Sequence, residues 1–196
     1  MLTALFTSKV RVAMLSLFLR DPEAEHYVRE VTRVVGTEIN AVRRELDNLE
    51  RLGLIEKWPR GNRLYYRVVV GHPLYRSLLS LISCEVGLGG LIIKHKRKLG
   101  KIKYAFIARA LPMGRIAEEK DVDLFLVGDV HLEILKQYIR KVEKEHGHEL
   151  NYMALSEGEF SSLKARKDAF LNSLLLLPRI MLIGDEAEMV DAAPRV

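Results

Sequence analysis

The sequence has almost no cysteine and no long apolar run, and each shortage limits what the protein can be. Its single cysteine, Cys84, excludes an intramolecular disulfide and a zinc site built from several thiolates. No apolar stretch reaches the roughly 18 residues that a membrane-spanning helix needs. Lys9 and Arg11 interrupt the apolar start and no small-residue cleavage motif follows, so we expect no signal peptide. The simplest expectation is a soluble cytoplasmic protein that binds no membrane.

The remaining composition is that of a globular protein. The chain has 196 residues, of which 48% are hydrophobic and 29% are charged, enough for one large domain or two small ones. A formal net charge of +5 favours an anionic partner, although the location of the charges matters more than their sum.

The pattern of predicted elements changes near the middle of the chain. Residues 1–72 predict three helices and then two short strands, whereas residues 73–100 predict a connecting helix and a basic linker. Residues 101–196 alternate strands with helices, which predicts a mixed sheet with helices packed on it. The expected fold class is therefore α+β, with a helical N-terminal domain and a small α/β domain after it.

Capping residues set the helix boundaries in the first domain. Ser8 can cap a helix over residues 9–20, and Gly36 is a C-terminal stop for the second helix. Thr37 can then cap a third helix over residues 38–53. The short break between the second and third helices predicts a helix-turn-helix.

The third helix has two chemically different sides. At 100° per residue, Ile39, Val42, Leu46 and Leu49 share one side and predict core packing. A small residue lets the backbone approach a DNA groove, asparagine can pair with adenine, and arginine can bind guanine or phosphate. The alternative is an ordinary amphipathic helix with a solvated polar side. The polar side consists of Asn40, Ala41, Arg43, Arg44, Asn48 and Arg51.

A predicted hairpin follows this helix directly. Strands over residues 54–58 and 64–70 are joined by a turn whose tip is Arg60-Gly61-Asn62-Arg63. A basic hairpin tip in this position can contact the DNA backbone or minor groove. Together with Thr37 at the start of the third helix, the predicted DNA-binding residues are Thr37, Asn40, Ala41, Arg43, Arg44, Asn48, Arg51, Arg60, Asn62 and Arg63.

The segment YVREVTRVVGTEINAVRRELDNLERLGLIEKWPRGNRLYYRV resembles the winged helix-turn-helix of ArsR-like and MarR-like transcription regulators. The resemblance implies sequence-specific binding of double-stranded DNA by a homodimer. Leucines of the first helix, such as Leu15 and Leu19, and of the connector, such as Leu79 and Leu81, can serve as core or as dimer contact.

The second domain contains two carboxylates at the start of a predicted strand. In DVDLFLVGD, Asp121 and Asp123 lie two residues apart, so on a strand they point to one side and can share a divalent cation. The strand KYAFIARA, a loop and this segment resemble the minimal nucleotidyltransferases of the polymerase-beta-like superfamily. The two domain types are a familiar pairing in prokaryotic genomes. The alternative is a strand whose polar end keeps two exposed aspartates.

The match to the nucleotidyltransferase motif is incomplete. The family carries Gly-Ser where this chain has Ala105-Phe106, which removes a phosphate ligand. A third carboxylate is expected on the strand predicted over residues 148–155, where Asn151 stands in place of an acid and Glu149 is the only carboxylate. We therefore expect a transcription regulator with an inactive, nucleotidyltransferase-like sensor or assembly domain that binds a nucleotide effector or a partner protein. The alternative is a Mg²⁺-dependent enzyme that transfers a nucleotide to a protein or small molecule.

The linker contains the densest cationic run of the chain, from Lys94 to Lys103. Such a run can contact phosphates of DNA or an anionic effector. It can equally be a solvated helix end whose positive residues complement the helix dipole.

Overall fold

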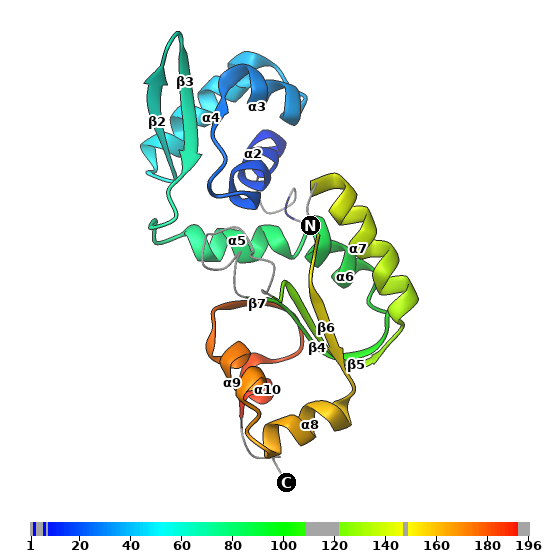
Figure 1. Ribbon diagram of the computed structural model, residues 1–196. Helices are drawn as coiled ribbons and strands as arrows, with labels where there is room; N and C mark the ends of the chain where they lie inside the picture. Colours follow the sequence, from blue (N-terminus) through cyan, green and yellow to red (C-terminus); the bar gives the residue numbers. More distant parts are fainter. Residues whose placement is uncertain (1, 3–5, 7, 109–121, 147–148, 192–196) are drawn as a thin grey trace. The chain divides into compact units, whose positions relative to one another are not determined.

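The computed structural model describes residues 2, 6, 8–108, 122–146 and 149–191 (Figure 1). The chain divides into two compact units, with the division between Ile82 and Ser83. Helices are combined with two small sheets, which confirms the α+β class.

Three helices form the body of the first unit: α2 (Lys9–Arg20), α3 (Val28–Val35) and α4 (Ile39–Arg51). Ser8 caps α2 as predicted, because its hydroxyl accepts the backbone N–H of Arg11 at 3.1 Å. Gly36 ends α3, also as predicted, with a left-handed φ of 67°. The predicted cap at Thr37 is wrong. Residues 37 and 38 stay non-helical after the glycine turn, so α4 starts later and Glu38 occupies the N-cap without a side-chain bond.

A three-stranded antiparallel sheet completes this unit. Its order is β1 (His26–Tyr27), β3 (Arg63–Val68), β2 (Ile55–Arg60), and the short β1 was not predicted. Leu15 and Leu19 of α2 lie in the core, at 4% and 1% exposed, so these two leucines are core residues. The buried side chains include Val12, Met14, Leu15, Phe18, Leu19, Val31, Val42, Leu46, Leu49, Leu54, Ile55, Tyr66 and Val68.

The predicted connecting helix is two helices, α5 (Tyr75–Ser83) and α6 (Gly87–His95), with a break between them. Gly87 takes a φ of 61°, which does not belong to a continuous helix. Among the described residues no single helix is long and apolar enough to cross a membrane, although this pair meets the same limits of length and composition together.

The second unit contains a mixed four-stranded sheet in the order β6 (Tyr152–Leu155), β5 (Leu124–Val130), β4 (Gly100–Ala108), β7 (Arg179–Ile183). Strands β5 and β6 are parallel, and the pairs β4–β5 and β4–β7 are antiparallel. A mixed sheet is the arrangement that the alternating strands and helices predict.

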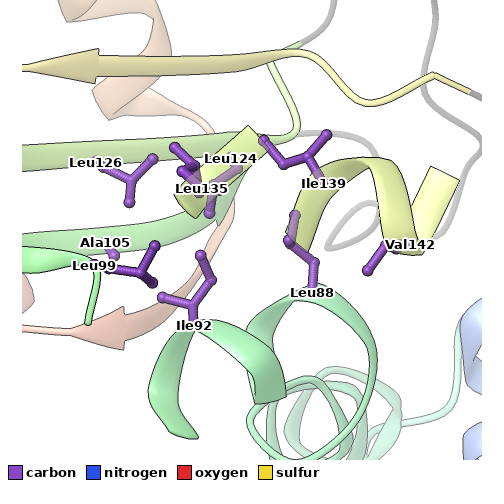
Figure 2. Close-up of a cluster of buried hydrophobic side chains, with 9 residues drawn as sticks. All are labelled: Leu88, Ile92, Leu99, Ala105, Leu124, Leu126, Leu135, Ile139 and Val142. Atoms are coloured by element: carbon purple, nitrogen blue, oxygen red, sulfur yellow. The ribbon is translucent and has the colours of Figure 1, made fainter. Parts of the chain in front are cut away.

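Helices cover both faces of this sheet. Helices α6 and α7 (Leu132–His146) cover one face through the side chains in Figure 2, which point toward one another from the sheet and the helices: Leu88, Ile92, Leu99, Ala105, Leu124, Leu126, Leu135, Ile139 and Val142. Helices α8 (Glu157–Ala165), α9 (Ala169–Leu176) and α10 (Glu186–Val190) cover the other face around Phe106 and Phe125. Alternate residues of the central strands therefore enter two separate cores.

Element ends in this unit differ from the prediction. The sequence pattern of residues 156–177 predicts one helix. In the structure it is interrupted at Lys167, which has a φ of 53°, and Asp168 then caps α9 by accepting the backbone N–H of Leu171 at 2.9 Å. Strands β5 and β6 begin at Leu124 and Tyr152, three and four residues later than predicted. The later starts determine where the candidate carboxylates lie.

Candidate nucleic-acid interface

Helix α4 separates its two sides sharply. Val42, Leu46 and Leu49 are at most 1% exposed and hold the helix in the core of the first unit, while Ile39 is half-buried. On the opposite side Asn40, Arg43, Arg44 and Arg51 are exposed, and Thr37, Ala41 and Asn48 are half-buried. The predicted polar side of α4 is therefore brought together on one accessible surface.

Two of the predicted residues on α4 also bind each other. Arg51 donates through Nη2 to Oδ1 of Asn48 at 2.5 Å, one turn apart at the C-terminal end of the helix. Within the described part of the chain, Arg43 and Arg44 form no ion pair. The side chain of Asn40 forms no hydrogen bond there either. The first half of α4 therefore has more hydrogen-bond donors available to a ligand than the second half, where Asn48 and Arg51 bind each other.

The carboxylates of α4 are mostly neutralised by neighbours. Glu45 is buried and accepts from Arg11 of α2 at 2.5 Å, and this hydrogen bond raises the pKa of Arg11. Glu50 accepts from Lys57 of β2 at 3.1 Å, which raises the pKa of that lysine. Asp47 is exposed and has no described ion partner. The positive potential around Arg43 and Arg44 is consequently reduced less than the sequence alone indicates.

The hairpin tip carries two arginines that lie over tyrosine rings. The guanidinium carbon of Arg60 is 3.8 Å from the ring centroid of Tyr65, and that of Arg63 is 4.5 Å from the centroid of Tyr27. The two tyrosine rings are 5.8 Å apart. Hydrogen bonding from Arg60, and then from Arg63, to the phenolate lowers the pKa of Tyr65. We call these four side chains the arginine–tyrosine stack.

Glu25 and the tip itself complete the geometry. Arg60 donates to Glu25 at 2.7 Å, and the Arg60 side chain is exposed while that of Glu25 is half-buried. Gly61 takes a φ of 59°, as the first central residue of a two-residue hairpin turn requires, and Asn62 beside it is exposed. A guanidinium stacked on an aromatic ring keeps its edge N–H groups available, so the stack orients Arg63 for anions, whereas Arg60 already donates to Glu25 through Nη1.

Tyr27 and Glu25 were missed as contributors because β1 was missed. The register places Tyr27 opposite Tyr65, and only that pairing brings the ring beneath Arg63. The aromatic and β-branched residues of HYV were the available signal, although two residues are too short a run to indicate a strand by periodicity.

The predicted metal site at the polar end of the second unit's sheet is described only in part. Asp121 lies outside the described residues, and Asp123 lies just before β5. The Asp123 carboxylate accepts the backbone N–H of Asn151 through Oδ2 at 2.9 Å, and the Asp123 N–H donates to the Asn151 carbonyl at 2.8 Å. Glu149 is exposed and precedes β6, so its predicted place on that strand is wrong. These two hydrogen bonds join the chain just before β5 to the chain just before β6, so Asp123 has a structural role there.

Among the described residues, which do not include Asp121, no three carboxylate, histidine or cysteine side chains gather closely enough to hold a metal ion. Ala105 and Phe106, which replace the Gly-Ser of the resemblance, are 0% exposed and enter the two cores on opposite faces of β4. A phosphate cannot approach the backbone there, so the side chain of Phe106 is a core group rather than part of an entrance.

Comparisons of this chain with models of protein families, with curated proteins and with solved structures gave no significant match. Its function is therefore inferred from its own residues.

Proposed function

We propose that this protein is a sequence-specific DNA-binding transcription regulator whose second unit senses an effector or assembles the protein. The observation that carries the proposal is the pair of cationic surfaces in the first unit: the exposed side of α4 with Arg43 and Arg44, and the hairpin tip with Arg60 and Arg63. A helix of this kind fits the major groove, and an adjacent basic hairpin can contact backbone or minor groove.

In this proposal the two surfaces make different contacts with DNA. Asn40 and Arg44 contact base edges, because asparagine forms bidentate hydrogen bonds with adenine and arginine forms them with guanine. Ala41 allows the backbone of α4 to approach the groove. Arg60 and Arg63 contact phosphates or the minor groove and fix the register of the helix without specifying sequence by themselves.

The proposal is tested by selecting bound duplexes from a random pool and measuring affinity for the selected sequence. Arg44→Ala should weaken binding by about 1–3 kcal/mol, or roughly 5- to 150-fold, and relax sequence preference. Arg63→Ala should weaken all duplexes alike and lower the salt slope by about 1. Arg76→Ala is the charge-matched control, because Arg76 is exposed on α5 and away from α4 and the hairpin in sequence. Equal effects of Arg44→Ala and Arg76→Ala would refute the proposal.

We further propose a homodimer that binds two half-sites. Leu74 and Leu81 are 53% and 41% exposed and occupy positions seven residues apart, whereas Leu79 and Ile82 are buried. Leu74 lies just before α5 and Leu81 lies on it, and these two exposed leucines offer apolar surface to a second copy. Sedimentation of the protein should give a dimer that Leu81→Lys shifts toward monomer, and selected sequences should then contain two half-sites about one helical turn apart.

For the second unit we prefer sensing or assembly to catalysis. Ala105 and Phe106, which replace the Gly-Ser of the resemblance, are fully buried and cannot contact a triphosphate. Nucleotidyl transfer with Mg²⁺ stays the alternative, carried by the position of Asp123 immediately before β5. A shift of the DNA affinity by nucleoside triphosphates, measured with the selected duplex, would support a nucleotide effector. Transfer of label from a triphosphate to protein would instead support the enzyme.

A further inference from the structure

The second unit concentrates its positive charge in one place. Residues 94–103 contain six lysines and arginines and no carboxylate, although cations and acids are nearly balanced over the unit as a whole. Lys103 forms an ion pair with Glu157 at 3.2 Å, so its charge is neutralised. The other five cations are all exposed and are called the basic tract: Lys94, Lys96, Arg97, Lys98 and Lys101.

The basic tract is not neutralised by neighbouring acids. Within the described part of the chain none of its five side chains forms an ion pair. The nearest carboxylate by strand register is Asp129, opposite Lys101, and it too has no described ion partner. Five exposed cations without an ion pair among the described residues leave a positive local surface.

The helix dipole accounts for only part of the tract. Lys94 lies in the last turn of α6, where a positive charge complements the negative helix end, and His95 beside it stacks on Tyr138 of α7 at 5.2 Å. The dipole effect fades beyond the last turn, yet Lys96, Arg97 and Lys98 follow the helix and Lys101 lies on β4. Something other than helix stabilisation is needed to explain these residues.

The backbone of the tract is fixed at its centre. Leu99 is 0% exposed, and its carbonyl accepts the N–H of His131 at 2.8 Å. The ring Nδ1 of His131 also lies 3.0 Å from the carbonyl oxygen of Lys98. Gly100 has a φ of 107°, and a Cβ there would lie 2.0 Å from the Asp129 carbonyl oxygen, so the turn admits no other residue readily. The cations therefore extend from a pre-ordered backbone, which lowers the entropic cost of binding a polyanion.

We propose that the basic tract is a second nucleic-acid contact of this protein, one that binds the phosphate backbone of duplex DNA without reading sequence. Unpaired, exposed lysines and arginines on a fixed turn supply what phosphate binding requires, and counterion release provides the driving force. The inference rests on the proposed function only for its choice of DNA as the polyanion. Because the tract is covalently joined to the first unit, it raises DNA affinity through a high effective concentration.

The test uses the full chain and a fluorescent duplex of random sequence, with affinity measured by anisotropy over a series of KCl concentrations. The tract variant replaces Lys94, Lys96, Arg97 and Lys98 with glutamine. A matched control variant replaces the exposed cations Arg140, Lys141, Lys144 and Arg166 with glutamine, so both lose the same formal charge. Thermal unfolding of all three proteins checks that they stay folded.

Each phosphate contact contributes about 0.9 to the slope of log affinity against log salt, so the tract variant should lose about 2–3 in slope. At low salt its affinity should fall at least tenfold, whereas the control variant should change by less than about threefold. Equal losses in the two variants would reduce the effect to net charge and overturn the inference, as would unchanged binding in both. Displacement of the duplex by polyglutamate from wild type but not from the tract variant would overturn the choice of nucleic acid and indicate an acidic protein partner.

A parallel titration with the selected duplex separates this inference from the proposed function. The ratio of affinities for selected and random duplexes should be unchanged in the tract variant, because phosphate contacts carry no sequence information. A protein that prefers no duplex, but whose tract variant still loses salt slope, would refute sequence-specific regulation and leave the inference standing. If the protein keeps its preference for the selected duplex and the tract variant loses no salt slope, sequence-specific regulation stands and the inference about the basic tract is refuted.

Discussion

Helix α4 and strand β4 both carry residues that the sequence marks for function, and they place them in opposite environments. On α4 the marked residues Asn40 and Arg44 are exposed while Leu46 is buried. On β4 the marked residues Ala105 and Phe106 are both 0% exposed, because helices cover both faces of the sheet. An amphipathic helix divides core from surface along its length. A central strand with two covered faces can offer functional groups only at its ends.

The largest expected effect comes from opening β4. Phe106→Ser restores the serine of the nucleotidyltransferase motif but removes a ring stacked on Phe125 at 5.0 Å and lying beneath Arg179. We expect a loss of about 4 kcal/mol or more in the free energy of unfolding, from the cavity and from a buried hydroxyl. Urea unfolding measures it.

Phe170→Ser is the control for this change, because Phe170 lies on α9 with 47% of its surface exposed. Its loss should stay below about 1 kcal/mol. A small loss at Phe106 would mean that β4 tolerates a polar group in its interior, and the contrast with α4 would then disappear.

The next effect tests the buried side of α4. Glu45 is 8% exposed at its side chain and pairs with Arg11, whose side chain is 36% exposed. Arg11→Met should lower the free energy of unfolding by about 2 kcal/mol, less than for a fully buried pair, because it strands the Glu45 carboxylate in the core.

The double variant Arg11→Met/Glu45→Leu should recover most of that loss, since replacing both charges with apolar groups removes the unpaired carboxylate. Denaturant unfolding of both single variants and the double variant forms the cycle. Strictly additive losses would show that the two charges do not act as a pair between α2 and α4.

How far the sequence predicts this molecule depends on how local each feature is. Ser8 and Gly36 marked helix ends correctly, because caps use neighbouring backbone groups. Strand β1 was missed because it exists only through pairing with β3, forty residues away in the chain. The interruption at Lys167 was missed although Asp168, a strong capping residue, followed it.

The candidate site follows the same rule. Periodicity along α4 predicted its exposed side, whereas the late start of β5 moved Asp123 off the strand on which its role had been argued. Strand ends are determined by tertiary pairing, here the bonds between Asp123 and Asn151, and periodicity cannot supply them. The arginine–tyrosine stack depends on the pairing of β1 with β3, so it could not be predicted from the sequence either.

A smaller effect is expected from the arginine–tyrosine stack. If the hairpin tip binds DNA as proposed, Tyr65→Leu should weaken binding about three- to fivefold, because an exposed cation–π contact is worth about 0.5–1 kcal/mol. Tyr65→Phe keeps the ring under Arg60 and should bind within about twofold of wild type. Anisotropy with the selected duplex measures both. Equal losses for Leu and Phe would assign the effect to the hydroxyl and not to stacking.

The smallest expected effect is at Asp123, where a structural bond and a metal site predict different outcomes. An asparagine amide oxygen can still accept the Asn151 N–H, so Asp123→Asn should cost less than about 0.5–1 kcal/mol at this partly exposed position. Asp123→Leu removes the acceptor and should cost more. If the carboxylate instead holds Mg²⁺, the ion should raise the unfolding temperature of wild type and not of Asp123→Asn, and label from a triphosphate should depend on that carboxylate. Since the Asp123 carboxylate already accepts the Asn151 backbone N–H, we expect Mg²⁺ to affect both proteins alike.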